Sequence, residues 1–343
     1  MTESNPLLSD LPYDVLVKIT DFLKVKDILN LCSTSKHLYD ILYLIRFSDL
    51  MDFTTIRFLP YFDSFTRVIY FESPNRYPNA IQRLYLCSEE STPEIWPLSL
   101  THLEFNDVFD ELLQTLPDSL KHLKLGWSYN QILPDLPDGL THLELGCRYN
   151  QTFASLPDSL TSLKLGQQYS QPLPPLPNSL RDLYLGTSYK HSFSSLPASL
   201  RCLHLGNEYN KPLPKLPALL EDLYIGWFYT KHLPELPDSI TNLHLGYNYN
   251  HPIYRLPQSL KCLELSSRFN HPLPSLPLTL KHLKVGYDYN HPLPELPDSL
   301  TDLLLGGVYN YPLKRLPKSV TRIVARKSLV LQNIPSNVEV IRI

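Results

Sequence analysis

Three histidines stand at a fixed spacing that could bring them together around a metal ion. His251, His271 and His291 are 20 residues apart, and imidazole is a common zinc ligand. If the chain stacks in 20-residue coils, the three rings would lie on neighbouring turns. No carboxylate or thiolate shares their place in the spacing, and loop histidines are usually solvated. We therefore predict no metal site and no cofactor.

Motifs of common catalytic sites do not occur in the sequence. It contains no G-x-S-x-G, Walker loop, H-E-x-x-H or zinc-ribbon spacing. The odd number of cysteines, with no C-x-x-C pair, favours reduced thiols in the cytosol or nucleus. Because the repeats described below continue to Ile343 and leave no room for a catalytic domain, we predict that the protein is not an enzyme. The cysteines are Cys32, Cys87, Cys147, Cys202 and Cys262.

Composition and charge argue against two classes of binding partner, nucleic acids and membranes. The 343 residues carry a net charge of −3 and no basic run, which argues against nucleic-acid binding. The N-terminus has no secretory pattern, and no apolar run approaches the about 20 residues that span a bilayer. We expect no membrane binding and an intracellular location, cytoplasmic or nuclear, or the host cell cytoplasm if the protein is viral.

A 20-residue repeat organises most of the chain. Leu-Pro recurs every 20 residues from Leu116 to Leu316. With that leucine as position 1, positions 5, 8 and 10 are aliphatic in all ten full units between 116 and 315. Position 11 is Gly except at Ser266, and position 14 is Tyr except at Phe269. Positions 17 and 19 are often Pro, at a density that excludes long helices.

Each unit is predicted to form one coil of a leucine-rich-repeat-like parallel β-solenoid with an extended, Pro-rich convex side. Positions 8 and 10 would share one face of a short strand, and Pro-x-Leu-Pro favours an extended return. Stacking would bury positions 1, 5, 8, 10, 14 and 18 in ladders, while Asn at position 15 bonds its own backbone. Weaker copies would extend the array to about 15 strands and cap it. Their core residues are Phe65, Val68, Tyr70, Ile81, Leu84, Leu86, Leu100, Leu103, Phe105, Val338, Ile341 and Ile343.

The L-x-x-L-x-L core, as in Leu120, Leu123 and Leu125, resembles leucine-rich repeats of the 20-residue class. Other residues, such as Ser128, Gln168 and Glu208, mostly replace the Asn that usually follows the last strand leucine by three residues. Tyr-Asn comes one residue later, as in Tyr129-Asn130 and Tyr249-Asn250. This aromatic-Asn-x-Pro-Leu ending is similar to the FNIP repeat of amoebal and giant-virus proteins. The resemblance is strong over 116–315 and holds in outline over 64–343. It implies a solenoid that binds another protein; a pure spacer is the alternative.

Residues 9–46 follow helical spacing instead. We expect three short helices, the first capped by Ser9 or Asp10, the second by Asp27 and the third opening at 33–35. The string that begins with Leu11-Pro12 and ends with Asp27-Ile28-x-x-Leu31 is similar to the F-box, although Leu38 replaces a common tryptophan. The resemblance implies docking on the Skp adaptor of a cullin-based ubiquitin ligase through Leu11, Pro12, Leu16, Ile19, Leu23, Ile28 and Leu31. A helical cap over the first strand is the alternative.

Positions 7 and 9 of each repeat alternate with the buried strand residues and should face outward on the concave side. They vary from repeat to repeat, and the middle repeats are rich in aromatic residues, which are favoured at binding hot spots. We predict that a target protein docks on this patch; packing between neighbouring strands is the alternative. The patch consists of Asp182, Tyr184, His204, Asp222, Tyr224, Trp227, His244 and Tyr247.

The expected organisation is a flexible N-terminus (1–8), an F-box (9–46), a linker (47–63), degenerate repeats (64–115), ten full repeats (116–315) and capping repeats (316–343). This order predicts a substrate-recognition adaptor of a Skp-cullin-F-box ubiquitin ligase. The alternative is a protein-binding repeat module or decoy that recruits no ligase.

Overall fold

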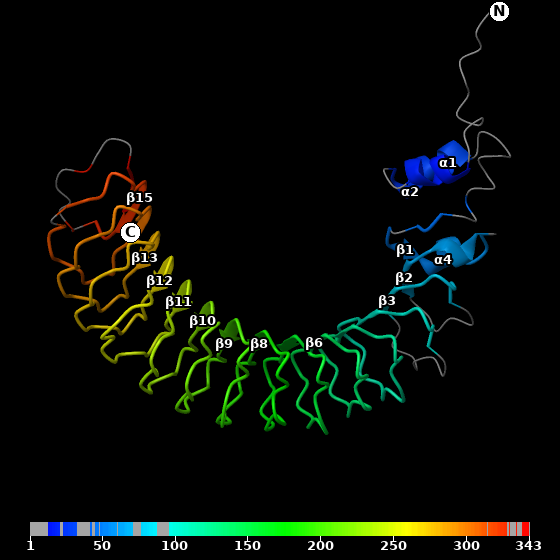
Figure 1. Ribbon diagram of the computed structural model, residues 1–343, viewed down its shortest axis with the longest axis horizontal. Helices are drawn as coiled ribbons and strands as arrows, with labels where there is room; N and C mark the ends of the chain where they lie inside the picture. The colour runs from blue at the N-terminus through cyan, green and yellow to red at the C-terminus, as the bar shows by residue number, and fades with distance from the viewer. Residues whose placement is uncertain are drawn as a thin grey trace, which may run out of the picture. The chain divides into compact units, whose positions relative to one another are not determined.

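The computed structural model describes residues 13–20, 23–32, 42, 45–47, 49–59, 61–70, 77–87, 96–313, 315–327, 329, 334 and 338–342. The chain forms two compact units, Met1–Leu140 and Thr141–Ile343 (Figure 1). Leu11 and Pro12, the expected helix caps at 9–10 and the expected third helix lie outside the described residues.

Two helices of eight residues each open the first unit. They are α1 (Tyr13–Thr20) and α2 (Val25–Cys32). Leu16 and Ile28 are buried, whereas Leu23, between the helices, is 37% exposed. Helices of this length are marginal in water by themselves, so their stability depends on what covers their apolar side.

Residues 47–63, which we expected to be a linker, contain regular structure. They include β1 (Met51–Asp52), α4 (Phe53–Ile56) and a 3-10 helix, η3 (Phe62–Ser64). The Asp52 carboxylate accepts a hydrogen bond from the backbone N–H of Thr54 at 2.7 Å and begins α4. Because β1 pairs in parallel with β2 (Arg67–Tyr70), this stretch adds a strand to the sheet.

The rest of the first unit is a parallel stack of single strands. β2 is followed by β3 (Arg83–Leu86), β4 (His102–Phe105) and β5 (His122–Lys124). Residues 68, 84, 103 and 123 stand side by side, which is the register predicted from the degenerate repeats.

In the described residues of the second unit, eleven strands repeat the pattern, and consecutive full repeats pair with a shift of 20 residues. In Figure 1 these strands line the inner side of the curved unit. They are β6 (His142–Glu144), β7 (Ser162–Lys164), β8 (Asp182–Tyr184), β9 (Cys202–His204), β10 (Asp222–Tyr224), β11 (Asn242–His244), β12 (Cys262–Glu264), β13 (His282–Lys284), β14 (Asp302–Leu304), β15 (Arg322–Ala325) and β16 (Glu339–Arg342).

Two tight turns shape each coil. The N–H at position 5 donates to the Pro carbonyl at position 2, as from Ile240 to Pro237 at 3.2 Å. The N–H of the position-14 tyrosine donates to the position-11 carbonyl, as from Tyr209 to Gly206 at 3.2 Å. A Cβ on Gly226 would lie 1.9 Å from the Gly206 oxygen, so close packing between coils explains the glycine column.

The predicted columns at positions 5, 8, 10 and 14 form the core. Leu203 and Tyr209 are both 0% exposed, and position-14 rings of neighbouring coils in the second unit stack with centroids 6.2–6.5 Å apart. Tyr149, Tyr209 and Tyr289 all belong to this column. Burial raises the pKa of Tyr289 to about 12, while the backbone N–H of Leu273 partly offsets that rise.

Three details differ from the sequence prediction. Asp27, which we expected to cap the second helix, lies in the first turn of α2, which begins at Val25. Asn at position 15 bonds the next coil rather than its own backbone, since Asn250 Oδ1 accepts from the N–H of Asn270 at 3.0 Å. In β16, Val340 rather than Ile341 pairs with Ile323, so the register that we assigned to the last repeat was wrong by one residue. The strand is half-exposed on both faces, and such strands specify register weakly.

Candidate binding surface

Four of the predicted target-binding residues form one stack, which we call the aromatic row. Tyr184, His204, Tyr224 and His244 occupy position 9 of neighbouring strands, on the strand side of the second unit. Ring centroids are 4.5, 3.7 and 4.1 Å apart in that order. His204, Tyr224 and His244 stack face to face, whereas the Tyr184 ring is tilted by 38° to His204. Stacking uses the ring faces for packing, so a partner would meet mainly ring edges and polar tips.

The aromatic row is electrically neutral near pH 7. Burial lowers the pKa of His204 to about 4 and also lowers the pKa of His244, although Glu264 beside His244 opposes that shift. Cys202 Sγ lies 3.6 Å from the Tyr184 hydroxyl, and burial raises the pKa of this thiol to about 11.

Charged pairs flank the aromatic row at position 9. Lys164 Nζ lies 3.1 Å from Glu144 Oε1 on one side, and Lys284 Nζ lies 3.1 Å from Glu264 Oε2 on the other. At position 7, the Asp222 carboxylate accepts a hydrogen bond from the Asn242 amide, and burial raises the pKa of Asp182. A partner would therefore meet a neutral aromatic strip with defined charged ends.

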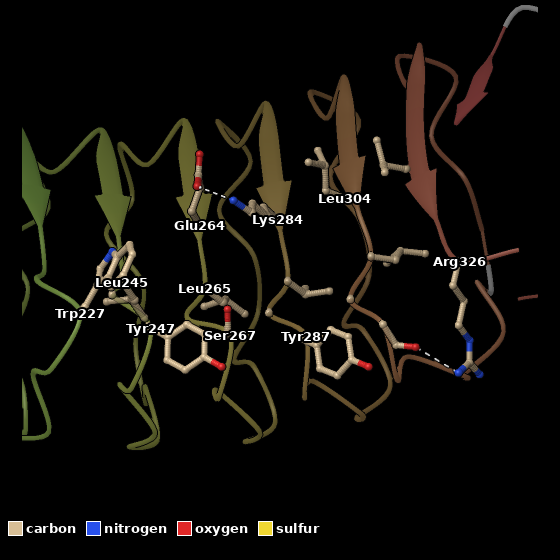
Figure 2. Close-up of a pocket in the computed structure, with 17 residues that line it drawn as sticks. Trp227, Leu245, Tyr247, Glu264, Leu265, Ser267, Lys284, Tyr287, Leu304 and Arg326 are labelled. Carbon is tan, nitrogen blue, oxygen red and sulfur yellow. Dashed lines mark hydrogen bonds and ion pairs between the residues drawn. The ribbon is translucent and has the colours of Figure 1, made fainter. Parts of the chain in front are cut away.

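Trp227 and Tyr247 do not join the aromatic row. They lie at position 12, past the ends of the strands, where they line a groove of about 690 Å³ together with Tyr287 (Figure 2). Trp227, Tyr247 and Tyr287 are 60%, 51% and 63% exposed, and residues such as Leu245, Leu265 and Val285 line the groove between them. The groove is mostly apolar and of the size that binding pockets commonly have.

The predicted patch thus divides into two neighbouring surfaces, the aromatic row and the position-12 groove. Sequence reasoning missed Tyr287, Lys284 and Arg326, which also line the groove. A signal for Tyr287 was present in the sequence, because 227, 247 and 287 share one repeat position and all are aromatic.

The three histidines with metal-like spacing have a different role. His251 Nε2 lies 2.7 Å from the Thr230 carbonyl oxygen, and His271 and His291 Nε2 each lie 3.1 Å from the carbonyl of Asn250 or Asn270. A ring nitrogen that faces a carbonyl carries the proton and donates it. These histidines therefore tie each coil to the preceding one.

Part of the predicted adaptor-binding set can be located. Leu16 and Ile28 are buried, Ile19 and Leu31 are half-buried, and Leu23 is the most exposed of the five. The structure thus covers Leu16 and Ile28 and leaves Leu23 partly open to solvent. Among the described residues, no helix combines the length and apolarity needed to cross a membrane.

Family comparisons match both parts of the chain. The FNIP Repeat model matches residues 92–128, 112–147, 129–168, 149–188, 169–208, 231–268, 253–288 and 289–323, which together make up more than half of the chain. The F-box domain model matches residues 8–48. None of the curated proteins matches the chain significantly.

Solved structures support the solenoid. CroV588, a circular leucine-rich repeat protein, is 28% identical with a TM-score of 0.64 over 83% of this chain and 50% of its own. This chain thus spans half the length of CroV588. YopM from Yersinia enterocolitica WA-314 is similar in fold, with 24% identity, a TM-score of 0.60 and coverage of 81% of this chain and 71% of YopM.

Proposed function

Because the chain belongs to the FNIP-repeat family and carries an F-box domain ahead of its repeats, we propose that it is the substrate-recognition adaptor of a Skp-cullin-F-box ubiquitin ligase. An F-box domain and a leucine-rich-repeat-type fold are typical of binding proteins without catalytic activity. In this role the chain brings a target close to the ligase, and proximity replaces chemistry of its own. It would act in the cytoplasm or nucleus, or in host cytoplasm if viral.

The F-box domain supports the adaptor half of the proposal. Its helices are short, and Leu23 between them is 37% exposed, so an apolar partner surface would cover side chains that the chain itself leaves open. We propose that Leu11, Pro12, Leu16, Ile19, Leu23, Ile28 and Leu31 bind a Skp-type adaptor directly or support the helices that do.

The aromatic row and the position-12 groove support the target-binding half. Exposed tryptophan and tyrosine residues around an apolar floor are typical of interface hot spots. We propose that the target meets Tyr184, His204, Tyr224 and His244 in the row, Asp182 and Asp222 beside it, and Trp227 and Tyr247 in the groove.

The F-box match is the observation that carries the adaptor role, and a pulldown with a purified Skp adaptor tests it. Replacing both Leu11 and Pro12 with alanine should abolish capture while circular dichroism shows a folded solenoid. The matched control makes the same two changes at Leu216 and Pro217, in the repeats, and should leave capture intact. If the first variant binds as well as the unaltered chain, the F-box assignment is wrong.

Target binding can be tested in cells by proximity labelling with quantitative mass spectrometry. A target should be labelled by the unaltered chain and lost when Tyr184, Tyr224 and Trp227 are all replaced by alanine. Trp127→Ala, which alters an exposed tryptophan at the same repeat position in the first unit, should retain it. The alternative is a decoy that recruits no ligase. It would be favoured if a target is labelled but never ubiquitinated, and if its level does not rise in cells that carry the variant with Leu11 and Pro12 replaced.

A further inference from the structure

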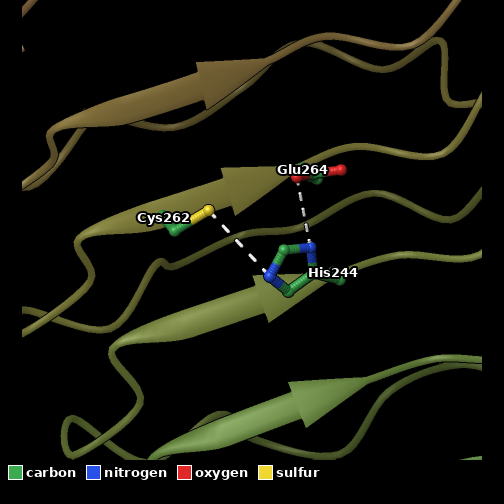
Figure 3. Close-up of side chains that lie close together, drawn as sticks. All are labelled: His244, Cys262 and Glu264. Carbon is green, nitrogen blue, oxygen red and sulfur yellow. Dashed lines mark hydrogen bonds and ion pairs between the residues drawn. The ribbon is translucent and has the colours of Figure 1, made fainter. Parts of the chain in front are cut away.

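Nitrogen, sulfur and oxygen donors meet beside the C-terminal end of the aromatic row (Figure 3). His244 comes from β11, and Cys262 and Glu264 come from β12; one ligand atom from each lies within 4.8 Å of the other two. Parallel pairing places His244 beside Glu264, and strand alternation puts Cys262 on the same face two residues earlier. The sheet itself therefore brings the three side chains together.

Each nitrogen of His244 lies near one of the other two donors. His244 Nδ1 lies 3.4 Å from Glu264 Oε1, and His244 Nε2 lies 3.9 Å from Cys262 Sγ. Donors bound at about 2.0–2.3 Å from zinc are separated from one another by about 3.3–3.7 Å at tetrahedral angles. With the imidazole in place, rotation of the Cys262 and Glu264 side chains toward the same His244 nitrogen would bring the three donors to these separations.

A further imidazole, outside the group of three, approaches Glu264 from the next strand. His282 on β13 pairs in register with Cys262, and its Nε2 lies 3.9 Å from Glu264 Oε1. Glu264 therefore has one oxygen between two imidazoles, while its other oxygen is 3.1 Å from Lys284 Nζ. Ligand carboxylates are commonly held in this way by an outer hydrogen bond.

The His244 ring is also restrained from behind. It stacks on Tyr224 with centroids 4.1 Å apart and planes within 6° of parallel. Stacking limits rotation of the imidazole and keeps both nitrogens toward β12, where Cys262 and Glu264 lie (Figure 3). Two of the donors are thus positioned by contacts outside the cluster, namely His244 by Tyr224 and Glu264 by Lys284.

The order thiol, imidazole, carboxylate could also describe a cysteine nucleophile. Cys262 Sγ lies 3.9 Å from His244 Nε2, whereas a nucleophile and its base commonly lie about 2.6–3.2 Å apart. A metal ion between the two side chains needs the wider spacing, and the thiol proton leaves to solvent when sulfur binds the metal.

We propose that His244, Cys262, Glu264 and His282 bind one zinc ion. Thiolate and imidazole ligands favour Zn²⁺ over Mg²⁺ or Ca²⁺, which prefer oxygen ligands. The site depends on the fold of the second unit and not on the adaptor role. Because His244 also belongs to the aromatic row, an ion bound there would fix that end of the row.

Cobalt titration of the metal-free full-length chain tests the proposal. One equivalent of Co²⁺ should give a thiolate-to-cobalt charge-transfer band, and Zn²⁺ should displace it while Mg²⁺ should not. Cys262→Ser should remove the band. Cys202→Ser, which makes the same change at the same repeat position beside Tyr184, should retain it. His244→Gln and His282→Gln should each weaken Co²⁺ binding by about tenfold or more.

A measurement on the unaltered chain guards against misfolding of a variant. Zn²⁺ should slow alkylation of Cys262 by a thiol reagent, read by mass spectrometry, and leave the rate at Cys202 in the same digest unchanged. Absence of the charge-transfer band from the unaltered chain, its survival in Cys262→Ser, or equal zinc effects on both thiols would overturn the proposal.

Discussion

The strands of the second unit have as few as three residues, and the helices α1 and α2 of the first have eight. Both kinds of element are too short to be stable alone, but different contacts stabilise them. Leu203 on β9 has equivalent leucines in register on β8 and β10, and the same contacts recur at every coil. Helices α1 and α2 have no such repetition, and Leu23 beside them remains 37% exposed. Repetition lets the solenoid bury its own apolar side, whereas the described part of the F-box domain leaves Leu23 partly exposed to solvent.

The largest effect should distinguish these two kinds of apolar residue. Tyr209→Ala removes a ring that is 0% exposed and stacked on both neighbours, so unfolding should become easier by about 3–5 kcal/mol. Leu23→Ala should change the unfolding free energy by less than about 1 kcal/mol while weakening capture by the Skp adaptor. Denaturant titration and pulldown measure the two responses. Equal destabilisation by both changes would contradict the comparison.

An intermediate effect should come from the glycine column. Gly226→Ala places a methyl group 1.9 Å from the Gly206 carbonyl oxygen, and this backbone atom cannot move without separating two coils. We expect the free energy of unfolding, measured by denaturant titration, to fall by about 1–3 kcal/mol.

Gly307→Ala is the matched control for Gly226→Ala. Its added methyl would meet the ring of Tyr287, which is 63% exposed and free to rotate away, so the loss should be clearly smaller. If the two substitutions lower the free energy of unfolding equally, close backbone approach is not the reason for the glycine at position 11.

Periodicity predicted the parts of the fold that repeat. The 20-residue shift, the buried columns and the tyrosine stack are confirmed, because apolar residues at positions 5, 8, 10 and 14 are covered by the same positions of adjacent coils. The predicted register of β16 was wrong, and this strand lies where the regular repeat ends. Val340 and Ile341 are both apolar and half-exposed, so their pattern does not tell which face of the strand is directed toward the core.

The surface was less predictable than the core. Position 9 was expected to face outward, but the sequence could not say that His204 and Tyr224 would stack their ring faces on each other. The possible zinc ligands were also missed, since His244 and Cys262 are 18 residues apart and belong to different positions of neighbouring repeats. A search of positions 7 and 9 across adjacent repeats, rather than down a single position, would have found them.

The smallest effect concerns the pH dependence of stability. The pKa of His204 is about 4 in the folded chain and near 6.5 when unfolded, because burial between two tyrosines disfavours the cation. Asp222 opposes this shift and His244 adds to it. As pH falls from about 6.5 to 4, the unfolded chain binds the proton first, so the native state loses stability in that window.

His204→Phe keeps an aromatic ring in the row and should flatten the dependence of the thermal midpoint on pH between 6.5 and 5. A His204→Phe profile that parallels the unaltered one would mean that the row does not hold this imidazole neutral.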